Sequence, residues 1–419
     1  MTSSSNSVKV RKPDLLNKFE KFECDINYAF IIPNEDIVIV LAEDRSVRIY
    51  IKRETGGFWP AVYHYLPSPG TCLQYCNNSK HIYIGCDNGT IMEFELKDDF
   101  NAIVHRRDYL SHVARVTGLI MSQKSKWLLS CSKDKLFAIY SAETGSCVDG
   151  FQLQSPCTCI KYDEEAKYVF VGDSSGRISF LDVRKCSEIG KPGRSGTELV
   201  KNLNGHSDQA IRSLDWDANN KKLISCGDDN LVIVWDIGGN KGEALELLGH
   251  FKPVTNVLSL ELFSNSKKNK SNNNIIISTS LDESVIFWNM NADRQQSASW
   301  SSSNNCDVCS TPFFWNWKKM WEDKKVGGRQ HHCRKCGKAV CDNCSPHFSR
   351  FPPMGFEIQV RMCGDCKNNI KESELTPLIN AFDSKHPISS MFFEFSRHLL
   401  ITVGKDRHIK LWNVKSLLE

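Results

Sequence analysis

Short stretches of alternating apolar and polar residues recur along most of the chain, and each ends near an aromatic residue. The clearest are "SCSKDKLFAIYS" (130–141), "SCGDDNLVIVWD" (225–236), "STSLDESVIFWN" (278–289) and "ITVGKDRHIKLWN" (401–413). In each, an aspartate follows a small hydroxyl residue by four positions, and Trp or Tyr follows six positions later. Such alternation on both sides of an Asp, Asn or Gly turn predicts a β-hairpin.

Weaker copies occur around Asp44, Asn88 and Ser175, which makes seven copies in total, at spacings of roughly 41 to 54 residues with one large gap. A histidine precedes three of the stronger copies: His112, His206 and His250. Histidine, hydroxyl, aspartate and tryptophan can form a hydrogen-bonded cluster that ties the strands of one hairpin unit together. The pattern resembles the WD-repeat family, which implies a mainly β fold, a seven-bladed β-propeller.

One interval between repeats is far longer than the others. Asp282 and Asp406 are 124 positions apart, and the surplus contains every closely spaced cysteine pair. Because insertions are tolerated in loops rather than strands, we expect a separate module between the sixth and seventh repeats. The predicted division is 13–296 for repeats one to six, 300–372 for the module and 373–416 for the last repeat. Residues 13–20 and the segment from Leu375 are expected to supply outer strands that close the ring.

The inserted module carries eight cysteines in four pairs, each with two residues between its members. Two such pairs complete a tetrahedral zinc site, so two zinc ions are predicted. Spacing alone leaves the pairing open, but the short interval from Cys336 to Cys341 favours an interleaved arrangement. One zinc would then take Cys306, Cys309, Cys341 and Cys344, and the other Cys333, Cys336, Cys363 and Cys366. Sites with four cysteines keep no open position for water, so hydrolytic metal catalysis is not expected.

Between the cysteines lie "RQHHCRKCG" (329–337) and "RMC" (361–363). These motifs resemble the FYVE zinc fingers, and a FYVE finger inserted before the last repeat is similar to the WD-repeat and FYVE-domain-containing proteins over essentially the whole chain. The resemblance implies a non-enzymatic scaffold that binds phosphatidylinositol 3-phosphate on early endosomes from the cytosol and holds protein partners on its propeller. The residues that carry over by position as headgroup ligands are Arg329, His331, His332, Arg334 and Arg361.

The chemistry of these residues suits a phosphate monoester, because guanidinium and imidazole groups supply converging, charge-assisted donors. Two positions depart from the family pattern. Ser303 stands where an aspartate would complete the WxxD motif that begins at Trp300, and its absence bears on headgroup affinity and selectivity. Gln330 stands where many members have a second basic residue.

The segment just before the basic motif is expected to face the membrane. Val326 and Gly327 would enter the acyl region, flanked by Lys324 and Lys325. Two lysines near an anionic surface contribute about 1 kcal/mol each, so a single finger is expected to bind weakly.

An aromatic run precedes this segment. "TPFFWNWKKMWED" (311–323) predicts a short helix with Phe313, Trp317, Met320 and Trp321 on one face. That face could be a membrane wedge, or it could pack over the finger or against the propeller. Packing is favoured, because apolar helix faces usually belong to a core.

Charge and composition exclude some functions. The 419 residues carry a net charge of only +4. The module has 12 Lys and Arg against 7 Asp and Glu, and its net charge is close to zero once eight thiolates hold two zinc ions. Nucleic acid is therefore not an expected partner. The longest apolar run is too short to cross a bilayer. The alternative function is a RING-like component of a ubiquitin ligase. Metal sites made of cysteine alone and the HHCR motif weigh against it. The partners and the oligomeric state stay open.

Overall fold

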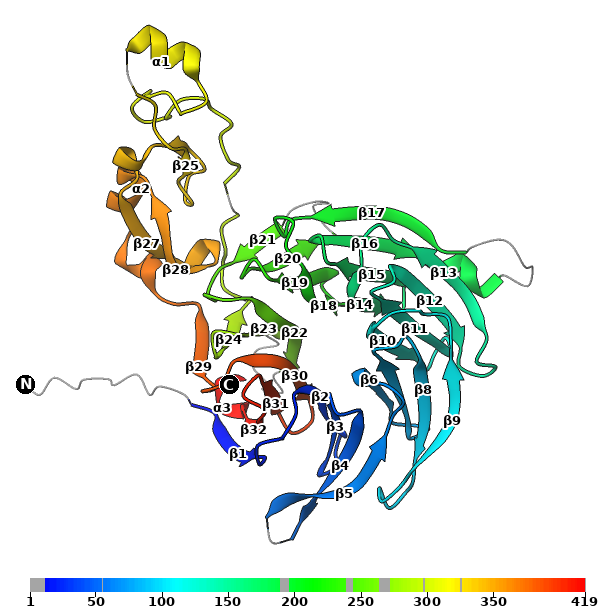
Figure 1. The fold of residues 1–419 in the computed structure, drawn as a ribbon. Helices are drawn as coiled ribbons and strands as arrows, with labels where there is room; N and C mark the ends of the chain where they lie inside the picture. Colours follow the sequence, from blue (N-terminus) through cyan, green and yellow to red (C-terminus); the bar gives the residue numbers. More distant parts are fainter. Residues whose placement is uncertain are drawn as a thin grey trace, which may run out of the picture.

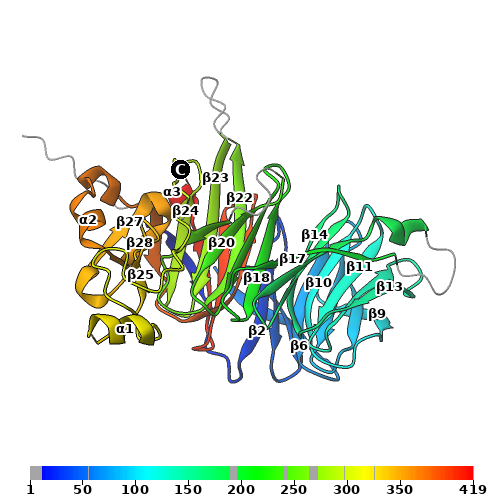
Figure 2. The same cartoon turned by 90° about the horizontal axis from the view of Figure 1, so that it is seen from above.

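The computed structural model describes residues 12–54, 56–188, 196–238, 244–263, 272–296, 298–324 and 326–418. Seven four-stranded antiparallel sheets form a ring, and a smaller module lies beside the ring at its rim (Figure 1). Seen after a quarter turn, the same module lies at one side of the propeller (Figure 2). The prediction of a mainly β, seven-bladed propeller is confirmed.

Within each blade, the first strand given below lies at the centre of the ring and the fourth lies at its outer edge. The blades are β2 (Ile26–Ile31), β3 (Ile37–Ala42), β4 (Ser46–Arg53), β5 (Gly57–Tyr65); β6 (Gly70–Cys76), β7 (His81–Cys86), β8 (Ile91–Leu96), β9 (Ile103–Tyr109); β10 (Val116–Ser122), β11 (Trp127–Ser132), β12 (Leu136–Ser141), β13 (Cys147–Gln152); β14 (Cys157–Asp163), β15 (Tyr168–Asp173), β16 (Arg177–Asp182), β17 (Glu198–Asn204); β18 (Ile211–Asp217), β19 (Lys222–Gly227), β20 (Val232–Asp236), β21 (Ala244–Leu247); β22 (Val254–Phe263), β23 (Asn272–Ser280), β24 (Ser284–Asn289), β29 (Ile379–Asp383); and β30 (Ile388–Glu394), β31 (Leu399–Gly404), β32 (Ile409–Asn413), β1 (Asp14–Lys18). A 3₁₀ segment, η1 (Arg184–Glu188), follows β16, and a short helix, α3 (Lys415–Leu418), follows β32.

The core lies between neighbouring blades. All six residues of β3, IVIVLA, are buried because both faces of its sheet are covered by adjacent sheets. The outermost strands are more exposed, as β5 shows with its Trp59, Tyr63 and Tyr65. The continuous run of apolar residues in the second strand of a blade, such as β3, therefore marks the interior of the ring.

Two blades are completed by strands from distant parts of the sequence. The N-terminal strand β1 pairs with β32, with Asp14 opposite Asn413, and so joins the two ends of the chain. Strand β29 pairs with β24, with Ile379 opposite Trp288. Both outer strands that the sequence predicted are present, and the inserted module interrupts the sixth sheet between its third and outer strands.

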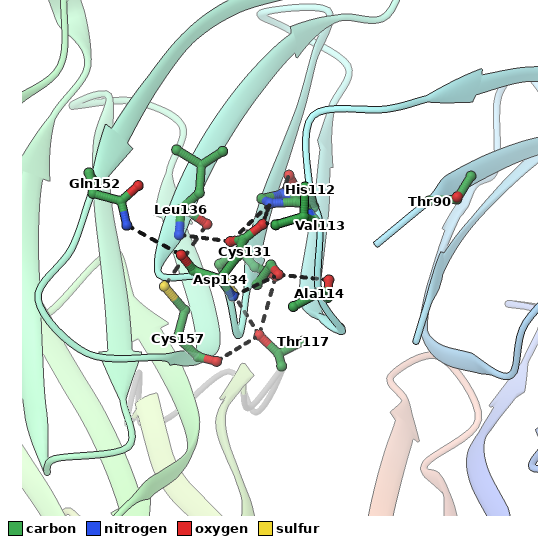
Figure 3. A network of polar contacts seen from close by, with 12 residues as sticks. Thr90, His112, Val113, Ala114, Thr117, Cys131, Asp134, Leu136, Gln152 and Cys157 are labelled. Atoms are coloured by element: carbon green, nitrogen blue, oxygen red, sulfur yellow. Dashed lines mark hydrogen bonds and ion pairs between the residues drawn. The ribbon is translucent and has the colours of Figure 1, made fainter. Parts of the chain in front are cut away.

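A buried polar cluster stabilises individual blades. In the fifth blade, His206 lies 2.9 Å from an oxygen of Asp229 and 2.7 Å from the hydroxyl of Ser225, which also accepts a 2.9 Å hydrogen bond from the indole of Trp235. In the third blade, His112 lies 3.0 Å from Asp134 in the same way (Figure 3). These contacts satisfy polar groups that would otherwise be buried without partners.

One further histidine of this kind, in the seventh blade, was not predicted from the sequence. His386 lies 2.9 Å from the hydroxyl of Thr402, which accepts a 3.0 Å hydrogen bond from the indole of Trp412. His386 precedes its hydroxyl partner by 16 residues, against 18 for His112. The histidine lies at nearly the same interval before its hydroxyl partner as in the third blade, so the position of Thr402 could have indicated it.

Candidate metal centres and basic site

The inserted module is built from short elements. They are α1 (Trp317–Asp323), β25 (His331–His332), β26 (Ala339–Val340), η2 (Asp342–Cys344), β27 (His347–Phe351), η3 (Pro352–Met354), β28 (Phe356–Met362), α2 (Gly364–Asn368) and η4 (Glu372–Leu375). Its single hydrophobic cluster includes several of the paired cysteines themselves. The ligand cysteines are therefore part of the core of the module.

The eight paired cysteines form two groups, in each of which the four sulfur atoms lie within 4.8 Å of one another. One group is Cys306, Cys309, Cys341 and Cys344, and the other is Cys333, Cys336, Cys363 and Cys366. The structure thus forms the interleaved arrangement that the sequence favoured, with two tetrads positioned for two zinc ions.

The surroundings of the sulfur atoms fit a bound cation. The backbone N–H of Cys341 lies 3.4 Å from the sulfur of Cys306, and the N–H of Cys363 lies 3.3 Å from the sulfur of Cys333, as expected for thiolates in tight turns. Burial and neighbouring thiols raise the pKa of Cys344. Four thiolates this close repel one another, so a divalent cation is needed to hold them together.

The two histidines of the basic motif form strand β25, which pairs with β26. The Nε2 atom of His331 lies 2.7 Å from the carboxylate of Asp342. The Nε2 atom of His332 lies 2.9 Å from the carbonyl oxygen of Ser301, and its ring stacks on Trp300 at a centroid distance of 4.7 Å. His332 therefore has a bracing role in the finger, and neither histidine is a ligand in the cysteine tetrads.

The two motif arginines are joined through the backbone, because the N–H of Arg334 donates a 3.1 Å hydrogen bond to the carbonyl oxygen of Arg361. The guanidinium of Arg334 lies 4.7 Å from the ring centroid of Trp300. The guanidinium of Arg361 donates a 2.8 Å hydrogen bond to the carbonyl oxygen of Ser345 and lies 3.5 Å from Asp342. Arg329, the first residue of the motif, is exposed.

The segment that lacks the WxxD aspartate is tied to the basic motif by neutral groups. The side-chain amide of Gln330 donates a 3.1 Å hydrogen bond to the carbonyl oxygen of Ser303. The nearest acid in the sequence, Asp307, accepts a 2.8 Å hydrogen bond from the N–H of Ala339. Burial alone would raise the pKa of Asp307, but hydrogen bonds from Ser301 and Ala339 lower it. Asp307 therefore braces the finger and does not replace the missing carboxylate.

The predicted membrane-facing residues have different environments. Val326 is 83% exposed and Lys324 is exposed, whereas Gly327 is buried. Lys325 lies outside the described residues. Val326 is thus the apolar side chain of this group that faces solvent.

The prediction for the aromatic helix is wrong in part. Phe313 is fully buried, but Trp317 and Trp321 are 75% and 87% exposed, and no residue of α1 is buried. Neither tryptophan is covered by the finger or the propeller. The helix begins only at Trp317, with Asn316 as its N-cap, so Phe313 lies outside it. The apolar period predicted a helix, but it showed neither where the helix starts nor whether its face is covered.

The finger contacts the propeller through backbone hydrogen bonds that the sequence does not predict. The N–H of Leu248, just after β21, donates to the carbonyl of Gly355, and the N–H of Glu357 donates to the carbonyl of Leu248, both at 2.8 Å. Gly355 has φ of +85°, and a Cβ atom there would lie 2.3 Å from the carbonyl oxygen of Glu246. The contact therefore requires glycine at this position.

The same contact brings a propeller carboxylate to the basic motif. Glu246 on β21 lies 4.0 Å from the guanidinium of Arg334. On the other side of the contact, the N–H of Gln295 donates a 2.7 Å hydrogen bond to the carbonyl of Pro353. The finger is thus held by the fifth blade and by the segment that leaves the sixth.

A propeller of WD repeats and a finger with two cysteine tetrads define a two-part class of protein, and both parts match known families. Residues 297–372 match the FYVE zinc finger, and 105–141, 197–236 and 378–413 match the WD domain, G-beta repeat. The chain belongs to the family of WD repeat and FYVE domain-containing proteins. It is 38% identical to the mouse protein 1 of that name, over 96% of this chain and 93% of the relative, and 39% identical to the human protein 2, over 96% of both.

A solved structure, the WD40 β-propeller domain of Doa1, has the same fold with a TM-score of 0.59 and 13% sequence identity, covering 96% of each chain. The match of the finger to the FYVE family does not favour the RING-like alternative. Among the described residues, no helix has the length and apolar character needed to span a membrane.

Proposed function

We propose that this protein is a peripheral membrane scaffold whose finger binds phosphatidylinositol 3-phosphate and whose propeller holds protein partners. The observation that carries the proposal is the convergence of the basic residues between the two cysteine tetrads. Arg334 and Arg361 are joined by a backbone hydrogen bond, and His331 and Arg361 both approach Asp342. Two cationic side chains thus meet at one carboxylate, and the backbone of Arg334 lies beside that of Arg361, which suits recognition of a phosphate monoester.

Two acidic side chains lie beside these donors and hold them in place. Asp342 lies 2.7 Å from His331 and 3.5 Å from Arg361, and Glu246 lies 4.0 Å from Arg334. A phosphate dianion carries more charge than a carboxylate and accepts more hydrogen bonds, so it would compete for the same donors. The two acids hold the cationic side chains near the positions that a headgroup would use.

The proposed site of action is the cytosolic face of early endosomes, where the 3-phosphate headgroup would recruit the chain. The zinc ions would shape the finger, because thiolate ligands fill all four positions of each site and leave none for substrate. The propeller offers exposed edge strands for protein partners, and we assign it no catalytic step.

Sedimentation with vesicles that contain single phosphoinositide isomers tests the proposal. The wild-type chain is expected to prefer the 3-phosphate, and Arg334→Ala to weaken that binding by about tenfold or more, which corresponds to one lost charge-assisted contact. Arg350→Ala is the matched control, because Arg350 is an exposed arginine of the same finger outside the motif. Equal binding to all isomers would contradict the proposal.

The variant Ser303→Asp tests the departure from the WxxD motif in the same assay. Restoring a carboxylate at that position is expected to increase the preference for the 3-phosphate over the other isomers, since a carboxylate can accept hydrogen bonds from inositol hydroxyls. An unchanged isomer preference of this variant, with both zinc ions retained, would show that position 303 does not face the headgroup.

A further inference from the structure

A carboxylate of the propeller lies at the edge of the basic site of the finger. Glu246 belongs to β21, the outer strand of the fifth blade, and this strand lies beside the finger (Figure 1). One oxygen of its carboxylate lies 4.0 Å from the guanidinium of Arg334. This distance is longer than a hydrogen bond, so the carboxylate oxygens remain available to a ligand. The side chains of Arg334 and Glu246 are 36% and 34% exposed, so a headgroup can reach both of them.

The position of Glu246 is fixed by the residues that follow it. Leu248, two residues later in the chain, forms a parallel β-bridge with Phe356 of the finger, and its side chain packs against the hydrophobic cluster of the finger. Its backbone hydrogen bonds with Gly355 and Glu357 are both 2.8 Å long. An added Cβ atom at Gly355 would lie 2.3 Å from the carbonyl oxygen of Glu246, so the two backbones are in close contact. The carboxylate therefore extends from a strand that is firmly docked on the finger.

The guanidinium that faces this carboxylate is oriented as well. It lies 4.7 Å from the ring centroid of Trp300, and the same ring stacks on His332 with an interplanar angle of 14°. The backbone N–H of Arg334 is hydrogen-bonded to the carbonyl oxygen of Arg361, the arginine of the second basic motif. Glu246 thus lies beside a donor that is held within the proposed headgroup site.

The finger has no acid of its own on the segment that begins at Trp300. Residues 300–306 contain neither aspartate nor glutamate, and Ser303 stands where the WxxD motif has its aspartate. The next acid, Asp307, accepts a hydrogen bond from the backbone N–H of Ala339. A carboxylate that selects among headgroups is therefore missing from this segment, and the docked propeller brings another one to the basic motif.

A carboxylate beside a bound 3-phosphate would affect selectivity in two ways. It accepts a hydrogen bond from a ring hydroxyl next to that phosphate. It also repels a second phosphate at the same ring position, because a phosphate monoester carries a charge of about −1.5 to −2 at neutral pH. Discrimination is a difference between two affinities, so repulsion of the wrong ligand contributes to it as attraction of the right ligand does.

We propose that Glu246 is a selectivity residue of the headgroup site, supplied by the propeller. It accepts the hydroxyl beside the 3-phosphate and rejects headgroups that carry a further phosphate there. This role rests on the proposed function, since it concerns the same site. The site is then built from both parts of the chain, and the pairing of Leu248 with Gly355 serves recognition because it holds Glu246 at the basic motif.

The test measures the binding of two soluble headgroups to the intact, zinc-loaded chain by isothermal titration calorimetry. Inositol 1,3-bisphosphate has a free hydroxyl at position 4 beside its 3-phosphate, and inositol 1,3,4-trisphosphate has a phosphate there instead. The ratio of the two dissociation constants is compared among the wild type, Glu246→Gln and Glu246→Asp. Glu198→Gln is the matched control, because Glu198 is an ion-paired acid on β17, the outer strand of the neighbouring fourth blade.

The wild type is expected to prefer the bisphosphate. Glu246→Gln is expected to reduce this preference by about tenfold, which corresponds to about 1.4 kcal/mol and is less than the cost of holding two like charges together. Glu246→Asp keeps the negative charge and should retain most of the preference. Glu198→Gln changes the net charge equally and should have the wild-type ratio. The zinc content should be the same in all four chains.

If Glu246→Gln binds both headgroups more tightly by the same factor, Glu246 only competes with phosphate for Arg334, and the selectivity role is overturned. Unchanged affinities of this variant, or a wild-type chain that binds both headgroups equally, would also overturn the role and leave the 3-phosphate site of the proposed function standing. A wild-type chain that binds neither headgroup, nor vesicles containing phosphatidylinositol 3-phosphate, would instead overturn the proposed function.

Discussion

The propeller and the finger reach a stable fold by different means. In the propeller, hydrophobic clusters continue from each sheet to its neighbour, and clusters such as that of His206, Ser225 and Trp235 satisfy the buried polar groups. In the finger, the cluster of buried residues also contains metal-ligating cysteines, among them Cys306 and Cys333. Burial supports the first part and metal coordination supports the second.

Because the two parts are stabilised by different interactions, the fold of one can be disturbed without disturbing the fold of the other. We expect the ring to stay folded when the finger loses its zinc ions. The docking of Gly355 against Glu246 is where the two parts meet. Substitutions or metal removal that change one part and leave the other intact test whether the two parts are stabilised independently.

The largest effect is expected from metal removal. Chelation of zinc, or Cys333→Ser with its partner thiolates left unpaired, is expected to unfold the finger, because a structural zinc site supplies on the order of 10 kcal/mol of folding free energy. Metal analysis should give two zinc ions per wild-type chain, and limited proteolysis should cut the chelated finger while the ring resists. Simultaneous loss of both parts would contradict the separation.

A core substitution in the propeller should give the opposite result. Trp288 is fully buried in the sixth blade, and its indole donates a 2.8 Å hydrogen bond to Ser278. Trp288→Ala is expected to lower the free energy of unfolding by about 3–5 kcal/mol, measured by urea denaturation, while zinc content is unchanged. Trp59→Ala, at an exposed position, should change it by no more than about 0.5 kcal/mol.

Acid should weaken the propeller through a buried histidine. Burial, followed by the nearby Lys410, lowers the pKa of His386 to about 4, although Asp406 opposes this shift. Because an unfolded histidine has a pKa of about 6.5, the unfolded chain binds more protons than the folded chain between these values. The stability is therefore complete above pH 6.5 and falls as the pH decreases toward 4.

The measurement is the thermal midpoint of the ring as a function of pH, in the wild type and in His386→Gln. The wild-type midpoint should fall from pH 6.5 to pH 4.5, and the variant, although less stable, should show a shallower decline in that interval. Parallel curves would show that other groups carry the acid sensitivity.

The smallest effect is expected at the contact between the two parts. Gly355→Ala should cost about 1–3 kcal/mol, because alanine is strained at positive φ and its Cβ atom would meet the carbonyl of Glu246. The expected readout is faster amide hydrogen exchange at Leu248 and Glu357, with zinc retained. Gly364→Ala is the control, since a Cβ atom there meets nothing within 4 Å.

Much of this organisation could be predicted from the sequence, because it depends on local patterns. The hydroxyl, aspartate and aromatic positions of the repeats are set by hairpin geometry, so they recur at fixed intervals. The four cysteine pairs are likewise local, and the short loop between Cys336 and Cys341 favoured the interleaved tetrads that the structure forms. The outer strands β29 and β1 followed from the need to complete two sheets.

The features that could not be predicted depend on which surfaces meet in three dimensions. The pairing of Leu248 with Gly355 and Glu357 joins segments about 107 residues apart, and nothing in either stretch of sequence marks the other. For the same reason the helical period placed Trp317 and Trp321 on one face but did not show that this face is exposed. Exposure is a property of the assembled fold rather than of the helix.

The central claim is that the finger recognises the 3-phosphate. Its most direct test is competition, in which soluble inositol 1,3-bisphosphate displaces the intact, zinc-loaded chain from vesicles containing phosphatidylinositol 3-phosphate. The account predicts displacement of the wild type by this compound and not by inositol 1,4-bisphosphate, and weak initial binding of Arg334→Ala. Equal displacement by both compounds would contradict it.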